Sequence, residues 1–201
     1  MTINQRALDQ LWDFADQAAS EARFRQAAAE AVGDDRDELL TQVSRSLGLQ
    51  ERYDDAAALL DTVELSTPTV RARVALERGR LHNSAGRAAE AIPFFQAAAA
   101  EPVDPFLVVD ALHMLAIADP ARSHDWTGQA LEVLTTVTDE RTLRWHVALH
   151  NNRGWALFDA GDPSSALPEF QAALDAAERW GTEQQVRWAR EALDECRAAL
   201  V

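Results

Sequence analysis

The sequence of 201 residues contains no lysine, one tyrosine and one cysteine, Cys196. A single cysteine excludes an internal disulfide, and its place in a helical stripe of apolar residues favours a packed thiol over a reactive one. Eight glycines and seven prolines are too few for a disordered chain. No apolar run approaches the roughly 20 residues of a membrane-spanning helix, and the first residues lack the apolar core of a signal peptide. We therefore expect a cytoplasmic protein with no membrane partner.

Basic residues are scarce. The chain has 19 of them, all arginine, against 33 acidic residues, which gives a net charge of −14 and an isoelectric point near 4.7. General binding to nucleic acid requires a surplus of basic groups to neutralise phosphates. The composition therefore argues against a nucleic-acid partner.

The common sequence motifs of catalysis are missing as well. The sequence has no glycine-rich phosphate loop, no Gly-x-Ser-x-Gly nucleophile turn and no paired cysteine motif. We predict that the protein is not an enzyme and requires no cofactor.

What the chain has in abundance is alanine at regular positions. Four alanines are each followed, four residues later, by a large apolar residue: Ala56 with Leu60, Ala91 with Phe95, Ala130 with Leu134, and Ala166 with Phe170. Successive alanines of this set are 35, 39 and 36 residues apart. A period in the thirties is typical of stacked helix pairs, and no stretch alternates as a strand would. The predicted fold class is all-α.

The spacing predicts four helix pairs, a helical segment before them and one helix after them. The segment covers residues 1–33 and packs on residues 34–201, so that all elements form one structural domain. The predicted helices are Glu38–Leu49 with Asp54–Val63, Val70–Ala85 with Ala88–Ala100, Phe106–Ala118 with Trp126–Val137, Arg141–Ala160 with Ser164–Arg179, and finally Glu183–Leu200. The last helix covers the end of the stack, because an uncovered terminal repeat would expose its apolar face.

Two of these pairs carry a longer pattern of small and aromatic residues. In the second pair the pattern consists of Gly79, His82, Gly86, Ala91, Phe95 and Ala98. In the fourth pair it consists of Gly154, Leu157, Gly161, Ala166, Phe170 and Ala173. In these residues the chain resembles the tetratricopeptide repeat family over about three quarters of its length. The resemblance implies a right-handed superhelical solenoid of antiparallel helix pairs, whose concave groove binds a protein or peptide.

The resemblance also places the first helix of each pair along the groove. The groove candidates are Arg73, Arg80, Asn83, His113, Asn151 and Trp155. Arg73 and Arg80 are seven residues apart, so they share a helix face that could hold acidic groups. Trp155 in the groove would be an aromatic anchor. The alternative is that the arginines form solvated surface pairs, such as Arg73 with Glu77.

Three histidines define a weaker alternative. His146 and His150 are four residues apart on one predicted helix, a spacing that can chelate a transition metal, and His113 has the equivalent place one repeat earlier. No carboxylate or thiolate lies at a suitable spacing to complete a ligand set. A structural role is therefore the preferred interpretation, and no metal site is predicted.

Together these features predict a non-catalytic scaffold that binds a protein or peptide, with acidic partners as the first candidates. The runner-up is a regulatory domain that senses a small anion or a signalling peptide. A metal-binding protein or enzyme using His113, His146 and His150 comes third. We expect a monomer or a weak homodimer, because the apolar side of the final helix has no further repeat to cover it.

Overall fold

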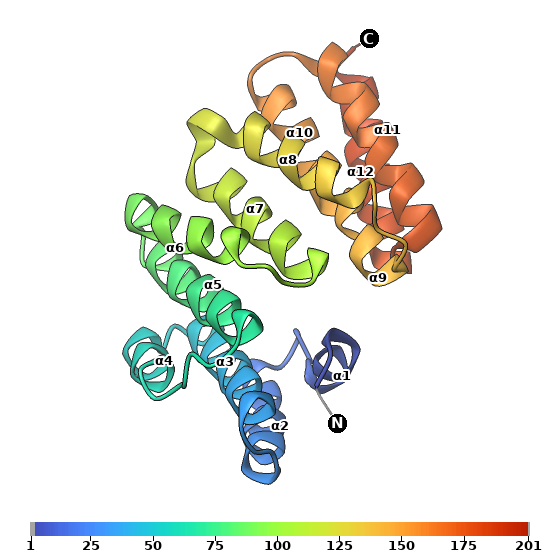
Figure 1. Ribbon diagram of the computed structural model, residues 1–201. Helices are drawn as coiled ribbons and strands as arrows, with labels where there is room; N and C mark the ends of the chain where they lie inside the picture. Colours follow the sequence, from blue (N-terminus) through green and yellow to red (C-terminus); the bar gives the residue numbers. More distant parts are fainter. Residues whose placement is uncertain (1–2, 201) are drawn as a thin grey trace. The chain divides into compact units, whose positions relative to one another are not determined.

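The computed structural model describes residues 3–200, and all regular structure in that range is helical, which confirms the all-α fold class (Figure 1). The first part contains α1 (Gln5–Leu11), α2 (Gln17–Glu30), α3 (Asp34–Leu49), α4 (Tyr53–Leu60), α5 (Pro68–Ser84), α6 (Ala88–Ala100) and α7 (Pro105–Ala118). A 3₁₀ turn at Pro120–Arg122 leads to α8 (Ser123–Leu134), α9 (Glu140–Leu143), α10 (Trp145–Asp159), α11 (Pro163–Trp180) and α12 (Glu183–Ala198). Within the described range no helix is both long and apolar enough to cross a bilayer.

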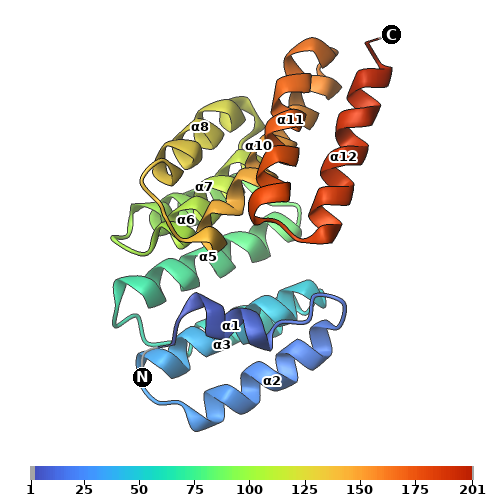
Figure 2. The same ribbon diagram turned by 90° about the vertical axis from the view of Figure 1, so that its right-hand side faces the viewer.

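The chain divides into two compact units, with the boundary between Pro120 and Ala121. In the first unit α2 packs on α3, α3 packs on both α4 and α5, α5 packs on α6, and α6 packs on α7. The short α1 lies beside α3 (Figure 2). The boundary falls between α7 and α8, the two helices that the sequence assigns to the third pair.

The second unit is built around α11. This helix packs on α10 and on α12, and α8 and α9 lie against α10. Phe170 is completely buried in its core, together with Leu193 and Cys196. The Cys196 thiol donates a hydrogen bond to the Pro163 carbonyl oxygen at 3.3 Å, and burial raises the pKa of the thiol. The expectation of a packed thiol is therefore met.

The repeated alanines lie at the centres of the helix contacts. All four are completely buried, and their large apolar partners are at most 2% exposed; the set is Ala56, Leu60, Ala91, Phe95, Ala130, Leu134, Ala166 and Phe170. The sequence pattern therefore marks the core correctly in both units.

Two glycines allow aromatic rings into these contacts. A Cβ atom at Gly154 would lie 2.7 Å from a ring carbon of Phe170, and a Cβ atom at Gly79 would overlap the ring of Phe95. Real atoms do not pack this closely, so α5 and α10 need glycine where the rings cross them. In both pairs the glycine therefore allows a close approach of the two helices.

The predicted helices are present, but several of their ends differ by three or four residues. The helix α3 begins at Asp34 rather than at Glu38, α4 ends at Leu60 rather than at Val63, and α8 covers Ser123–Leu134 rather than Trp126–Val137. In the N-terminal segment α2 begins at Gln17, because the Asp16 side chain accepts a hydrogen bond from the Ala19 amide and caps the helix. The helix predicted at Arg141–Ala160 is interrupted at Arg144, which separates α9 from α10.

Candidate functional site

In the first unit, side chains from α3, α5 and α7 form a row of buried ionic contacts. At one end the Arg73 Nε of α5 lies 2.9 Å from a carboxylate oxygen of Glu38 on α3, and both side chains are buried. The Arg73 guanidinium also donates to the Gln5 amide oxygen at 3.1 Å. Burial raises the pKa of Glu38, although Arg73 opposes this. Arg73 is therefore paired inside the protein, with Glu38 rather than with Glu77.

Arg80, two turns further along α5, joins two buried carboxylates. Its guanidinium donates to Glu77 on the same helix and to Asp110 on α7, the latter at 2.6 Å. Burial alone would lower the pKa of Arg80, but the two carboxylates outweigh it and raise that pKa. Burial likewise would raise the pKa of Asp110, and the arginine charges lower it instead. Arg80 is thus neutralised by internal partners.

A cavity of about 180 Å³ opens beside Arg80, between α3, α5 and α7. Its lining consists of Arg45, Gly48, Leu49, Glu77, Arg80, Leu81, Ser84 and Met114. Among residues 3–200, none forms a hydrogen bond or ion pair with the Arg45 side chain, whose guanidinium carbon lies 5.5 Å from the centre of the Trp12 ring. Burial lowers the pKa of Arg45, and the positive charge of Arg80 acts in the same direction. Arg45 is the cation of this cavity that no carboxylate neutralises by direct contact.

His113 on α7 interacts electrostatically with the same ionic row. Burial lowers the pKa of His113, the charge of Arg80 acts in the same direction, and Asp110 opposes them. His113 is therefore held towards its neutral form. The Asn83 side chain is half-buried and makes no hydrogen bond to a described residue.

The N-terminal segment covers the end of the ionic row at which Arg73 pairs with Glu38. Leu8 of α1 is completely buried in the core, and the Trp12 indole donates to the Gln42 amide oxygen at 3.2 Å. A cavity of about 200 Å³ remains where α1 meets α3, α5 and the start of α7, with Gln5, Glu38 and Arg73 in its lining. Gln5 of α1 thus contacts Arg73 directly and leaves a cavity of limited size beside it.

The two histidines of α10, His146 and His150, contact each other and other side chains of the second unit. The His146 ring stacks on the His150 ring and on the Trp180 ring, each at 5.6 Å between centroids. His150 Nδ1 lies 2.8 Å from Glu169, whose carboxylate also lies 3.2 Å from Arg153 Nε. Residues 3–200 contain no group of three side chains that could hold a metal ion. A metal site built on His113, His146 and His150 therefore has no ligand set among these residues.

Trp155 contributes to the core. Its ring meets Phe170 edge-on at 5.0 Å and Phe158 at 5.5 Å, and the residue is partly buried. The exposed tryptophan of this unit is Trp188 on α12, with 58% of its surface accessible. Trp188 is therefore better placed than Trp155 to act as an anchor for a partner.

Trp188 borders a cavity of about 200 Å³ between α10 and α12. The other lining residues are Val147, Ala148, Asn151, Asn152, Gln185 and Ala189. Neither Asn151 nor Asn152 forms a side-chain hydrogen bond with any described residue, and the Gln185 amide oxygen accepts from the Thr182 amide in a capping box. This cavity combines an apolar floor with amide groups that have unused donors and acceptors. We call it the α10–α12 cleft.

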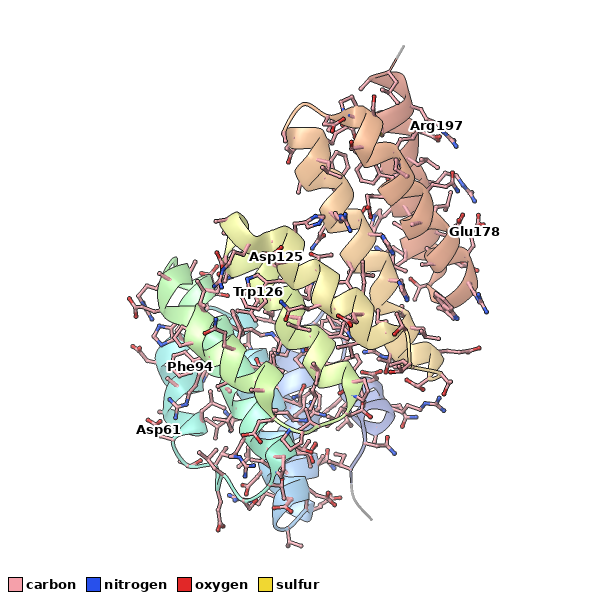
Figure 3. All side chains as sticks on the ribbon, turned by 45° about the horizontal axis from the view of Figure 1, so that its top comes forward. Asp61, Phe94, Asp125, Trp126, Glu178 and Arg197 are labelled. Atoms are coloured by element: carbon pink, nitrogen blue, oxygen red, sulfur yellow. The ribbon has the colours of Figure 1, made fainter. Side chains whose placement is uncertain are left out.

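Charges elsewhere on the surface form solvated pairs. Asp61 and Glu178, both labelled in Figure 3, pair with Arg78 at 2.7 Å and with Arg190 at 3.0 Å. Exposed pairs of this kind contribute about 0–1 kcal/mol. They do not indicate a binding site.

The predicted groove residues fall into two groups. Arg73, Arg80, Asn83 and His113 belong to the first unit, where the two arginines are part of the ionic row and the Asn83 side chain makes no hydrogen bond to a described residue. Of the other two, Asn151 borders the α10–α12 cleft and Trp155 does not. Asn152, Gln185 and Trp188 were not predicted from the sequence. The ion pairs were not predicted either, although opposite charges one repeat apart, such as Glu38 with Arg73 and Arg80 with Asp110, were a usable signal.

Taken together, residues 3–200 form an all-helical structure with buried polar networks and the three small open cavities described above. No family model matches the chain. A search of curated proteins likewise found no match. Among solved structures the chain is similar to BtubC (BKLC) from P. vanneervenii, with a TM-score of 0.64 and 16% identity over 96% of this chain and 84% of that one. At this identity the likeness supports the fold alone.

Proposed function

We propose that the protein is a non-catalytic, cytoplasmic peptide-binding scaffold. In this proposal its helix pairs form a right-handed superhelix of the tetratricopeptide type, and the α10–α12 cleft binds the peptide. The single observation that carries the proposal is Trp188, a large aromatic side chain that is 58% exposed beside two asparagines whose side chains make no hydrogen bond to any residue between 3 and 200. Exposed aromatic residues next to polar groups are typical centres of binding energy in interfaces.

The chemistry of the cleft indicates how a peptide would bind. An apolar peptide side chain would pack on Trp188, Val147 and Ala189, while Asn151 and Asn152 would each offer one donor and one acceptor to the peptide backbone. At about 200 Å³ the cleft has room for one side chain and not for a larger cofactor. The arginines of the first unit do not take part, because Arg73 and Arg80 are already paired.

Selection from a library of random peptides on the whole protein tests this proposal. We expect enrichment of peptides with a large apolar residue, and we expect an excess of soluble Trp188→Ala protein to compete poorly for them. Arg187→Ala, an exposed neighbour on the same helix, should compete as well as the wild type. The absence of enriched peptides, or equal competition by both variants, would exclude the cleft as a peptide site.

A further inference from the structure

The cavity between α3, α5 and α7 has two chemically distinct sides. Leu49, Leu81 and Met114 provide apolar surface, and Arg45 and Arg80 provide guanidinium groups. Leu49 is half exposed and Ser84 is exposed, so solutes can reach the cavity from solvent. A ligand that fits has an apolar body and an anionic end.

Arg45 is the side chain that can receive the anionic end. Arg80 donates to both Glu77 and Asp110, so its charge is compensated by direct contacts. Arg45 has no such contact with any residue between 3 and 200, and its guanidinium carbon lies 5.5 Å from the centre of the Trp12 ring. A carboxylate is the planar acceptor that a guanidinium fork matches best.

Size and charge limit the ligand further. A volume of about 180 Å³ lies below the range of about 300–1,000 Å³ that is usual for sites of drug-sized molecules, so only a short chain fits. Glu77 also borders the cavity and would repel a doubly charged phosphate more strongly than a single carboxylate. These constraints favour a singly charged acid with a small aliphatic group.

We propose that this cavity binds a carboxylate carried on a small aliphatic group, with Arg45 as its ion-pair partner. Two sources share this chemistry: a free small carboxylic acid, and the last residue of a peptide that ends in an aliphatic amino acid. This cavity shares no lining residue with the α10–α12 cleft, so its test is independent of the peptide proposal.

Met114 provides a direct readout, because the sequence has only two methionines. The whole protein, labelled with ¹³C at its methionine methyl groups, is titrated with 4-methylpentanoate and with acetyl-leucine. The corresponding neutral amides serve as controls. We expect either acid to shift the Met114 methyl signal in a saturable way below about 10 mM, and the amides to have no effect. A response to acetyl-leucine alone identifies a peptide end as the source, and a response to 4-methylpentanoate alone identifies a free acid.

Variants connect the signal to Arg45. Arg45→Gln should weaken binding by roughly tenfold or more, since a charge-assisted contact is lost. Arg36→Gln, on the exposed part of the same helix, should leave binding unchanged. If Arg45→Gln does not fold, Leu49→Glu at the exposed rim tests the same point, because its added negative charge should repel the acid. Equal shifts with acid and amide, no shift with either acid, or full binding by these variants would overturn the proposal.

Discussion

At the scale of single residues, two glycines determine how closely helices pack. An alanine at Gly79 or Gly154 would gain about 0.5–1 kcal/mol from lower backbone entropy in the unfolded chain, but it would overlap the ring of Phe95 or Phe170. Overpacking a core costs about 1–3 kcal/mol, so the clash should win. We expect Gly79→Ala and Gly154→Ala to lower the free energy of unfolding measured in urea.

The matched control for this prediction is Gly128 on α8. A Cβ atom there meets nothing within 4 Å, so Gly128→Ala should be neutral or stabilising. If all three variants changed stability alike, the close approach to the rings would not be the cause.

Arg80 is also predicted to be structural. Arg80→Met would leave Glu77 and Asp110 buried without their common partner, and breaking a buried pair in this way costs about 3–5 kcal/mol. Adding Asp110→Asn to that variant should restore part of the loss, because one of the unpaired charges is removed. Thermal unfolding measures both effects.

Arg87→Ala is the control for Arg80, since the contacts of the Arg87 side chain with Glu90 and His82 are exposed. It should change the free energy of unfolding by no more than about 0.5 kcal/mol. If Arg80→Met lowered the free energy of unfolding by no more than Arg87→Ala does, the ionic row would contribute little to stability.

His146 should make stability depend on pH. Burial, and secondarily the charge of His150, lowers its pKa below the ordinary 6.5, so the unfolded chain takes up the proton first as pH falls. The stabilisation that depends on neutral His146 is therefore fully present above pH 6.5 and is lost as the pH falls below that value. His146→Phe keeps the stacking but cannot titrate.

We expect urea unfolding to show a smaller loss of stability between about pH 7.5 and about pH 5.5 in His146→Phe than in the wild type. Other groups titrate in both proteins and cancel in the comparison; among them are His113, with the same sign, and Glu38, with the opposite sign. An identical pH dependence in both proteins would contradict the assignment.

At the scale of helices, α1 is held by side chains rather than by its own hydrogen bonds. It has seven residues, too few for a helix that is stable alone in water. Its anchors are the buried Leu8, the contact of Gln5 with Arg73 and the bond from Trp12 to Gln42. Loss of one anchor should therefore allow α1 to unfold while the rest of the first unit stays folded.

Leu8→Ala is expected to cost about 2–5 kcal/mol locally. Hydrogen exchange at the amides of Leu8 to Leu11 should become faster, while α10 and α11 keep their protection. Leu65→Ala, at a half-exposed position, should leave all rates unchanged. Equal acceleration in both units after Leu8→Ala would mean that α1 opens only when the whole chain unfolds.

Helix positions were predictable because their causes are local. The spacing of alanine and large apolar residues fixes which side of each helix is buried, and glycine opposite a ring is visible in the sequence as Gly79 and Phe95. The partners of the arginines were not predictable in the same way, because each residue along a helix turns the side chain by about 100°. A small rotation of the helix therefore exchanges a groove-facing side chain for a buried one, and Arg73, predicted for the groove, is buried against Glu38.

At the scale of the whole molecule, the protein carries a net charge of −14 and holds two arginines of its predicted groove in internal ion pairs. Arg73 and Arg80 are paired, and Trp155 is part of the core, so the predicted groove set does not provide a ready surface in the first unit. The exposed aromatic residue and the unused amides lie instead on α10 and α12. Neither could be chosen from sequence, because exposure of Trp188 rather than Trp155 depends on how α11 and α12 pack.

The affinity of one selected peptide for the wild type and for Trp188→Ala, measured by calorimetry, tests the central proposal most directly. A side chain at the centre of an interface contributes about 2 kcal/mol or more, so the variant should bind at least about 30-fold more weakly while keeping its fold. Arg187→Ala, the control, should bind within about twofold of the wild type. Unchanged affinity in Trp188→Ala would contradict peptide binding in the α10–α12 cleft.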